Sequence, residues 1–449
     1  MKMRTCDVLI IGGGISGAAL KFVLDRYTNV KRNILIEKNS RLAEENSHPL
    51  NNAQTSHDGG TETNYSLEHA LDVKKAATAI RSYVVQKGKV GIYKKTHRMV
   101  LGVGAEEVQL LKQRFAVFKD HYPDLRLIQG DEIARVEPKV MEGRNSNEPV
   151  AALISAEGFA INYQRLAESF VCDSEALARD TKSPVLFNEK VERIFYDNGY
   201  FTVQTKENKF LARAVVFEAG SYSLLFAQEL GYGKDYAILP VAGSFFSAGE
   251  FLRGKVYRVQ IEGMPFAAIH ADPDVLNQKD TRFGPTTKPL PLMERHKYKT
   301  FFDFIKLPLF TFRGFLSLCK ILAQKQLVGY VIKNMIFDLP VIGKLLFLKE
   351  ARVIVPTIRY RDLKLRRGVG GIRPQLVDLR TGELQMGDAT IVGENCIFNT
   401  TPSPGASVCL ANAKRDAEQV VKFLGIGFHF DKERFERDLG SYQTAPEEK

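Results

Sequence analysis

Two kinds of hydrophobic pattern share the first forty residues. Four consecutive apolar residues at 8–11 are typical of a buried strand, and a second apolar run follows at 33–36. Between the two runs, apolar side chains recur at helical spacing: Ala18, Ala19, Phe22, Val23 and Leu24. The pattern predicts a strand, a helix and a second strand, a unit that normally pairs its strands in parallel.

Glycines stand between the first strand and the helix. Residues 12–17 are GGGISG, and Glu37 follows the second strand twenty residues after Gly17. Gly12 allows the tight turn, Gly14 lets the backbone approach a pyrophosphate, and Gly17 lets helix and strand pack closely. The helix N-terminus would face the pyrophosphate, and Glu37 would accept hydrogen bonds from ribose hydroxyls. The segment therefore predicts a dinucleotide site.

Two later segments have the pattern of strands that return to the same sheet. Residues 215–220 close an apolar run on Ala-Gly, and residues 396–399 lead through 400–407 into a helical stretch at 408–424. The start of that helix offers free N–H groups either to a ligand or to an ordinary N-terminal cap.

No second dinucleotide fingerprint is complete. Residues 368–371, GVGG, follow the charged stretch LKLRR and lead into Ile372-Arg373-Pro374, which cannot open a regular helix. A single site favours one tightly held flavin over exchangeable cofactors, so no nicotinamide cofactor is expected.

Composition adds limits. The chain has 449 residues, 44% hydrophobic and 26% charged, which suits two intertwined globular domains. Its five cysteines show no metal or disulfide spacing and are expected to be reduced thiols in a cytosolic protein. MKMRT runs directly into CDVLIIGG, so no signal peptide is expected, and no apolar run reaches the length of a membrane-spanning helix.

The net charge of +11 is concentrated in one segment. Residues 296–350 mix bulky apolar side chains with nine basic and three acidic residues, a local net charge of +6. Pro308, Gly314 and Pro340 are expected to divide this segment into short helices. It fits either an interfacial surface on anionic lipid or a helical cap whose apolar side is core. Nucleic acid is not expected, because the charge lies among apolar residues and no binding module is present.

Residues 51–57, NNAQTSH, would alone be interpreted as a polar surface turn. They belong, however, to an ordered series of motifs: DVLIIGGGISGAAL, NSHPLNNAQTSH followed by Asn64-Tyr65, MEGR, PVAGSFF, GKVY, FGP and SPGAS. With this series the chain resembles the FAD-dependent oxidoreductases of the D-amino-acid-oxidase and glycerol-phosphate-dehydrogenase type. More narrowly, it resembles the malate:quinone oxidoreductase family. L-2-hydroxyglutarate dehydrogenases share the broad pattern and supply the main alternative.

The resemblance implies an FAD site. In such proteins the 51–57 loop passes along the flavin, and the helix start at 404–407 lies under the flavin ring, where its dipole would stabilise the anionic reduced form. The residues expected to contact FAD are Gly12, Gly14, Ile15, Ser16, Gly17, Glu37, Lys38, Asn51, Asn52, Ala53, Thr55, Val191, Gly220, Pro404, Gly405, Ala406 and Ser407.

Oxidising a 2-hydroxy acid requires a base for the hydroxyl proton and a hydride acceptor. His270, which ends an apolar run two residues before Asp272, is the preferred base, with Asp272 orienting its ring. The alternative for His270 is a strand-end histidine bonded to a backbone carbonyl. His57 is the second candidate base.

The substrate carboxylates require cations, and arginine suits them because its planar fork forms two parallel hydrogen bonds. Arg373, preceded by glycines in GGIRPQ, is the first candidate. Arg282, Lys255 and Tyr257 are further substrate-binding candidates, although single basic residues are more often simply solvated.

These expectations combine into an α/β fold with a Rossmann-like FAD-binding domain of discontinuous segments and an antiparallel-sheet substrate domain. The FAD-binding domain is expected at 1–90, 151–235 and 366–430. The substrate domain is expected at 91–150 and 236–365, carrying a helical, membrane-facing insertion at 296–350, and 431–449 form a C-terminal tail.

The expected activity is oxidation of (S)-malate to oxaloacetate by hydride transfer to flavin N5, with electrons passed to membrane quinone. The protein is expected in the cytoplasm, peripheral on the inner face of the cytoplasmic membrane and bound to anionic lipid through 296–350. The alternatives are an L-2-hydroxyglutarate dehydrogenase or related oxidase, and a flavin-binding or scaffold protein without chemistry.

Overall fold

The computed structural model describes residues 1–88, 91–177, 183–260, 268–277, 279–323, 325–385, 389–400 and 405–441.

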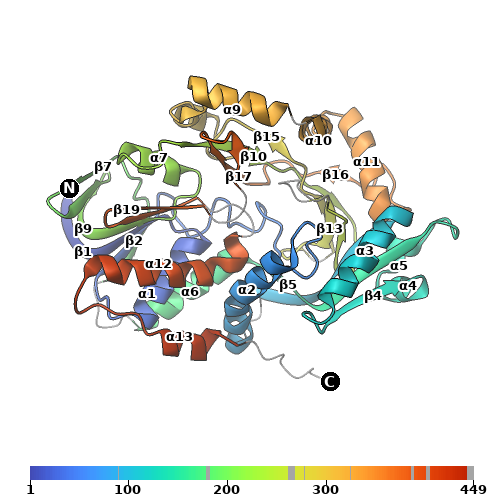
Figure 1. Cartoon of the computed structure of the whole chain (residues 1–449), viewed down its shortest axis with the longest axis horizontal. Helices are drawn as coiled ribbons and strands as arrows, with labels where there is room; N and C mark the ends of the chain where they lie inside the picture. The colour runs from blue at the N-terminus through green and yellow to red at the C-terminus, as the bar shows by residue number, and fades with distance from the viewer. Residues whose placement is uncertain are drawn as a thin grey trace.

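The first β-sheet contains the predicted strand–helix–strand unit. The described strands of this sheet follow the order β19-β20-β9-β1-β2-β6, and a β7–β8 hairpin extends it beside β9 (Figure 1). Their bounds are β1 Lys2–Ile11, β2 Asn33–Ile36, β6 Val185–Leu186, β7 Arg193–Asp197, β8 Tyr200–Gln204, β9 Asn208–Phe217, β19 Thr390–Gly393 and β20 Cys396–Asn399.

The core of this sheet is buried on both faces. β1 pairs in parallel with β2 and β9, and Val8, Leu9 and Ile10 are fully buried. Helix α1 (Ile15–Tyr27) packs one face together with α6 (Tyr163–Leu177) and α12 (Cys409–Leu424). A near-continuous apolar run is what a strand covered on both sides requires. The predicted α/β fold is thereby confirmed for this part of the chain.

A second large sheet is mostly antiparallel. Its described strands run in the order β16-β11-β14-β13-β12-β3-β5-β4, and β12 and β3 form its parallel pair. The bounds are β3 Tyr93–Val103, β4 Leu125–Gln129, β5 Val150–Ile161, β11 Phe246–Ala248, β12 Lys255–Arg258, β13 His270–Pro273, β14 Thr281–Gly284 and β16 Lys364–Leu365. His270 begins β13 rather than ending an apolar strand, because the pairing with β12 and β14 starts at His270.

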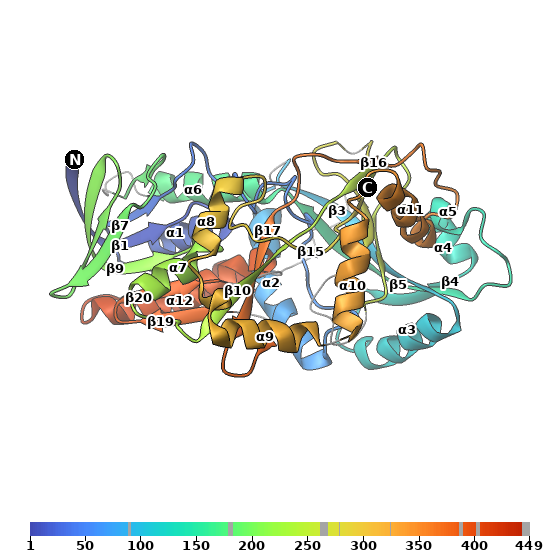
Figure 2. The same ribbon diagram turned by 90° about the horizontal axis from the view of Figure 1, so that it is seen from above.

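A small antiparallel sheet lies between the two large ones, with the order β15-β10-β17-β18 among the described strands (Figure 2). The bounds are β10 Tyr236–Ala242, β15 Lys288–Pro289, β17 Ile372–Asp378 and β18 Glu383–Leu384. β10 pairs with β17 so that Val241 lies opposite Arg373. The segment after GVGG is therefore a strand. This agrees with the prediction that Ile372-Arg373-Pro374 cannot begin a regular helix.

Further helices surround the sheets. They are α2 Leu67–Lys87, α3 Ala105–Phe118, α4 Asp131–Val136, α5 Pro138–Met141, α7 Tyr222–Glu229 and α13 Lys432–Leu439. A domain boundary was expected after residue 150, where β5 starts. Because β5 pairs along its length with β3, residues 150–161 belong to the second large sheet and not to the first.

The segment 296–350 is helical and lies at the periphery of the molecule (Figures 1 and 2). It contains α8 Phe301–Phe304, α9 Phe312–Leu322, α10 Lys325–Ile336 and most of α11 Ile342–Ile354. Pro308 and Pro340 separate helices as predicted, but Gly314 lies within α9. A side chain at Gly314 would meet the carbonyl oxygen of Pro308 at 2.3 Å, so this glycine permits close packing rather than breaking the helix.

The inner face of this segment is core, and the outer face is exposed. Phe304, Leu307, Leu309 and Ile321 join the hydrophobic core of the first sheet. Large apolar side chains on the outer face are exposed: Tyr298, Phe301, Phe302, Ile305, Phe312, Phe315, Leu316, Ile332, Met335, Leu339, Val341, Ile342 and Leu345. Within the residues that the structure describes, no helix combines the length and apolar character needed to cross a bilayer.

Candidate active site

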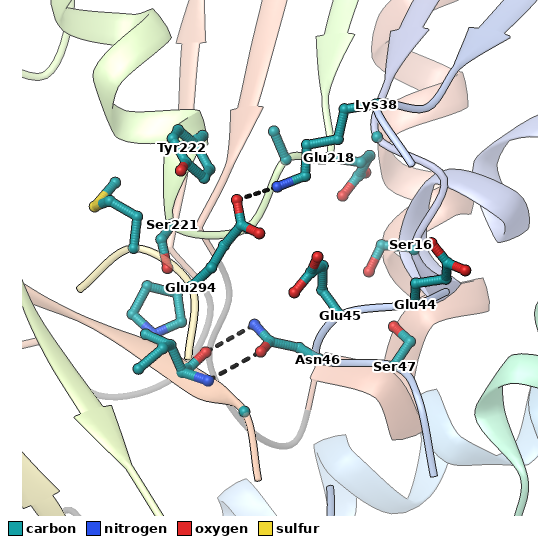
Figure 3. Close-up of a pocket in the computed structure, with 18 of the residues that line it drawn as sticks. Ser16, Lys38, Glu44, Glu45, Asn46, Ser47, Glu218, Ser221, Tyr222 and Glu294 are labelled. Atoms are coloured by element: carbon teal, nitrogen blue, oxygen red, sulfur yellow. Dashed lines mark hydrogen bonds and ion pairs between the residues drawn. The ribbon is translucent and has the colours of Figure 1, made fainter. Parts of the chain in front are cut away.

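A cavity of about 1510 Å³ opens where the carboxyl ends of β1, β2 and β9 meet the small sheet. Figure 3 shows its wall, with Lys38, Glu45 and Asn46 on one side and Glu294 and Tyr222 on the other. The carboxyl edge of a parallel sheet is where open α/β folds bind ligands.

The glycine turn has the geometry that a dinucleotide site requires. Gly12 has a φ of +114°, and a side chain there would meet the carbonyl oxygen of Glu218 at 2.4 Å. A side chain at Gly17 would meet the carbonyl oxygen of Gly12 at 1.9 Å, so Gly17 packs behind the cavity. Gly14 lines the cavity, and α1 begins there without a side-chain cap. Free N–H groups at such a helix start suit an anion.

Glu37 lines the cavity at the end of β2 and also fixes the turn. Its carboxylate accepts hydrogen bonds from the backbone N–H groups of Gly13, at 2.6 Å, and Asn39, at 2.9 Å. The acid that the sequence predicts for a ribose therefore has a second, structural role.

Most of the other residues expected to contact FAD line the same cavity. These are Ile15, Ser16, Lys38, Asn51, Asn52, Ala53, Thr55, Val191, Gly220, Gly405, Ala406 and Ser407. Pro404 lies outside the described residues.

Two residues that were not expected from the sequence, Asn46 and Ser47, also shape the cavity. Asn46 joins β17 through two hydrogen bonds, from its amide to the carbonyl of Ile372 at 2.7 Å and from the N–H of Ile372 at 3.0 Å (Figure 3). Ser47 accepts a hydrogen bond from the N–H of Ile15 at 3.0 Å. Both residues belong to the polar stretch just before NNAQTSH, and its polar character was the sequence feature that could have predicted them.

An ion-pair chain crosses the cavity wall. Glu294 pairs with Lys38 and Lys297, and Lys297 also pairs with Glu45. Burial would raise the pKa of Glu294, but the Lys38 ammonium and the hydrogen bond from Lys297 hold that pKa well below its usual range. These ion pairs connect the end of β2 to the start of the peripheral helical segment.

His57 lines the cavity in a fixed orientation. Its Nδ1 lies 2.6 Å from Oε1 of Glu62, and its backbone N–H donates to the hydroxyl of Ser407 at 2.9 Å. Burial would raise the pKa of Glu62, but the hydrogen bond with His57 and the charge of Arg98 lower it. An ionised Glu62 holds the ring by Nδ1, and Nε2 has no hydrogen-bonding partner among the described residues.

Arg373 lines the same cavity from β17. Burial lowers the pKa of its guanidinium, with the hydroxyls of Tyr330 and Tyr65 acting in the opposite direction. No carboxylate among the described residues forms an ion pair with Arg373. Arg373 is partly buried, and a cation that is partly removed from water without a counter-ion favours an anionic ligand.

The remaining candidate residues form a buried cluster behind the cavity. Arg282 pairs with Asp272 at 2.8 Å, and Lys255 and His270 lie 3.6 and 3.7 Å from the same carboxylate. Tyr257 shares a hydrogen bond with Thr55 at 3.0 Å. None of these five candidates is among the described residues that line the cavity.

His270 is held neutral in this cluster. Burial first, and then the nearby ammonium of Lys255, lower its pKa from 6.5 to about 3, and Nδ1 lies 3.4 Å from the carbonyl oxygen of Ala268. The structure thus agrees with the alternative of a histidine next to a backbone carbonyl.

We expect His270 to make folding sensitive to acid. The unfolded chain binds a proton at this histidine as the pH falls through 6.5, whereas the folded chain does so only near pH 3. The stability contributed by neutral His270 is therefore complete above pH 6.5 and decreases on acidification, by up to about 1.4 kcal/mol per pH unit. Denaturant unfolding of wild type and His270→Gln at about pH 7 and about pH 5 measures it. Equal losses of stability in both proteins would contradict this expectation.

The fold is similar to that of solved oxidases. It superposes on L-α-glycerophosphate oxidase from Mycoplasma pneumoniae, a structure with FAD bound, with a TM-score of 0.65, 18% identity and coverage of 99% of this chain and 100% of that one. Glycine oxidase from Geobacillus kaustophilus gives a TM-score of 0.64 at 15% identity, over 99% of this chain and 100% of that one.

Sequence comparison identifies the family. The model of "Malate:quinone oxidoreductase (Mqo)" matches residues 4–414. Malate:quinone oxidoreductase of Helicobacter pylori strain J99 is 39% identical over 453 residues, covering 98% of each chain. A probable malate:quinone oxidoreductase of Campylobacter jejuni is 38% identical, covering 96% of this chain and 99% of that one. The chain belongs to the malate:quinone oxidoreductase family, which confirms the resemblance noted from its motifs.

Proposed function

We propose that this chain binds FAD, oxidises (S)-malate to oxaloacetate and passes the electrons to a membrane quinone. One observation carries the proposal beyond family membership. Arg373, which has no ion-pair partner among the described residues, and His57, which Glu62 holds by Nδ1, line the same cavity as the glycine turn. A binding group for a carboxylate and a base therefore lie beside a dinucleotide site.

The size and chemistry of the cavity support FAD as the cofactor. Its volume of about 1510 Å³ exceeds the range of about 300–1,000 Å³ for drug-sized ligands, leaving room for a dinucleotide and a small acid. The glycine turn and Glu37 suit the adenosine diphosphate half, and Asn51, Asn52 and Ser407 add polar groups to the cavity wall. When bound, FAD would accept the C2 hydride at N5 and later release the electron pair to the quinone.

His57 is proposed as the base that takes the proton from the substrate hydroxyl. It is preferred over His270 because it lines the cavity, whereas His270 is only 2% exposed and lies in the cluster behind it. Glu62 orients the ring through Nδ1 and stabilises the positive charge that forms when Nε2 accepts the proton.

Arg373 is proposed to bind a substrate carboxylate. Its guanidinium can form two parallel hydrogen bonds with the carboxylate, and the ligand neutralises a charge that lacks a partner among the described residues. Binding through Arg373 would orient the substrate relative to His57.

A dehydrogenase or oxidase for L-2-hydroxyglutarate would use the same groups. Steady-state turnover with a soluble quinone analogue distinguishes the substrates, and peroxide detection distinguishes an oxidase. We expect malate to give the higher kcat/KM and little peroxide to form. A preference for 2-hydroxyglutarate would retain the proposed base and carboxylate site but overturn the proposed substrate.

The outer face of residues 296–350 is proposed to bind an anionic membrane surface. Phe312, Phe315 and Leu316 project from one face of α9, while Ile321 on the other face is buried. Exposed aromatic side chains together with a local net charge of +6 are typical of an interfacial surface. Such contact would place the protein on the inner face of the cytoplasmic membrane, where quinone is available.

Replacing both Phe312 and Phe315 with serine should weaken binding to phosphatidylglycerol vesicles by about tenfold or more, because each aromatic side chain loses apolar burial. Co-sedimentation measures the binding. Ile426→Ser is the matched control, since Ile426 is fully exposed between α12 and α13. Unchanged binding by the double variant would contradict the proposed surface.

The three sheets suggest how these functions are divided. We propose that the first sheet, with the segments expected at 1–90, 151–235 and 366–430, holds the cofactor. The segments expected at 91–150 and 236–365 would position the substrate. The expected C-terminal tail is wrong for residues 432–439, which form α13 and pack against α1 and α2, with Phe435 and Leu439 buried.

A further inference from the structure

The loop 49–55 separates the cavity from the buried cluster. Residues 51–55 line the cavity on one side of the loop. On the other side, Lys255 donates a hydrogen bond to the carbonyl oxygen of Ala53 at 2.5 Å and another to the hydroxyl of Thr55. Lys255 thus contacts the rear of the cavity wall, and it is only 2% exposed.

Arg282 holds the same loop at two further points. Its Nη1 donates to the carbonyl oxygens of Pro49, at 3.4 Å, and Asn52, at 3.3 Å, while its Nη2 binds Asp272. The C=O and N–H of a trans peptide point in opposite directions. Since the carbonyl of Asn52 faces Arg282, the N–H of Ala53 faces away from the cluster, towards the cavity. No described acceptor takes that N–H.

The loop is held in a conformation that needs this support. Gln54 has a φ of +55°, a left-handed conformation that is unfavourable for residues other than glycine. Its side chain donates to the carbonyl of Pro49 at 2.9 Å and to Asp274 at 3.2 Å. It also accepts a hydrogen bond from the N–H of Val275 at 2.9 Å. Strained backbone that surrounding side chains maintain is typical of a functional site.

The cluster also carries excess positive charge. Lys255 and Arg282 face the single carboxylate of Asp272, and His270 is neutral. Arg98 also approaches, donating to the carbonyl of Ser56 at 3.3 Å, but Arg98 and Arg81 together are balanced by Asp58 and Glu62. Asp274, which also interacts with the charge of Arg282, is balanced by Arg366. Burial lowers the pKa of Lys255 to about 8, so at neutral pH Lys255 is mainly protonated. One cation in excess therefore lies behind the part of the wall formed by Ala53 and Thr55. Charge in a low-dielectric interior acts strongly over such short separations.

We propose that Lys255, Asp272 and Arg282 form a positioning cluster for the bound flavin and do not contact the substrate. The cluster sets the N–H of Ala53 towards the cofactor. Its net positive charge stabilises the reduced, more negative form and so favours electron uptake. This role depends on the flavin function proposed above, and it assigns these residues to the electron affinity of the cofactor rather than to substrate recognition.

The test compares the flavin-loaded proteins. Lys255→Met should lower the midpoint potential of the bound flavin and raise its dissociation constant by about 10-fold to 100-fold, as expected when hydrogen bonds to a charged group are lost. The KM for malate should change little. Lys255→Arg, which keeps the charge, should restore most of the potential. Lys422→Met is the matched control, because Lys422 is exposed in the last turn of α12 and has no part in the cavity.

Two outcomes would overturn the proposed role. A Lys255→Met protein with unchanged potential but strongly raised KM for malate would make Lys255 a substrate ligand. Unchanged potential and unchanged flavin affinity would remove any role in positioning. If Lys255→Met fails to fold, Thr55→Val removes one of the contacts made by Lys255 and should still weaken flavin binding. If wild type binds no flavin, the proposed function fails first, so the two failures are distinguishable.

Discussion

Replacing Arg373 with methionine is expected to lower kcat/KM for malate by about 1,000-fold while leaving the bound flavin in place. The substrate carboxylate would lose a bidentate, charge-assisted interaction with a partly buried guanidinium. Arg373→Lys should recover only part of the loss, because an ammonium cannot reproduce the planar fork. Stopped-flow reduction of the flavin over a range of malate concentrations separates binding from hydride transfer.

Arg361→Met supplies the matched control for Arg373. The side chain of Arg361 is 76% exposed and only approaches the neighbouring Asp362, at 4.0 Å. Its replacement should leave kcat and KM unchanged. If Arg373→Met retained wild-type kcat/KM for malate, Arg373 would not be the carboxylate site. The absence of a counter-ion for this partly buried cation among the described residues would then need another explanation.

Replacing His57 with glutamine is expected to lower kcat by about 100-fold to 10,000-fold, the usual contribution of a general base. Malate should still bind, because Arg373 remains. Glu62→Gln should have a smaller effect, because the ring keeps a hydrogen-bonding neighbour but loses the negative charge that stabilises its protonated form. Stopped-flow reduction of the flavin at saturating malate measures both losses, and it should be much slower in His57→Gln than in Glu62→Gln.

His429→Gln is the control for His57, since His429 is exposed beyond α12. The comparison with His270→Gln decides between the two candidate bases. His270→Gln should affect acid stability more than turnover, because it lies in the rear cluster. A collapse of kcat in His270→Gln with near-normal turnover in His57→Gln would reverse the assignment.

The sequence pattern predicted those elements whose secondary structure depends on the burial of neighbouring residues. The strand predicted at 33–36 is β2, and the helix predicted from Ala18 to Leu24 lies within α1, because an uninterrupted apolar run and a helical spacing each suit one kind of burial. The first strand was predicted too short. β1 begins at Lys2, since its polar first half pairs with β9, a partner more than two hundred residues away in the sequence.

Many of the residues expected to contact FAD line one cavity, because the motif residues lie at strand ends and loops that converge there. The sequence could not show on which side of the loop 49–55 each partner would lie. His270, Lys255 and Arg282 contact or approach its rear, while His57, two residues beyond Thr55, lies on the cavity side. Glu62 acts through its contact with His57, five residues earlier in the chain, and no sequence pattern predicted that contact.

The measurement that tests the central claim most directly is the anaerobic absorbance spectrum of the purified protein near 450 nm, the usual position of an oxidised flavin band. Spectra are recorded alone, after malate, and then after a soluble quinone analogue. We predict a flavin spectrum that bleaches with malate and returns with the quinone. A flavin that malate does not bleach would contradict the proposed substrate, and a colourless protein that gains no spectrum with added FAD would contradict the whole account.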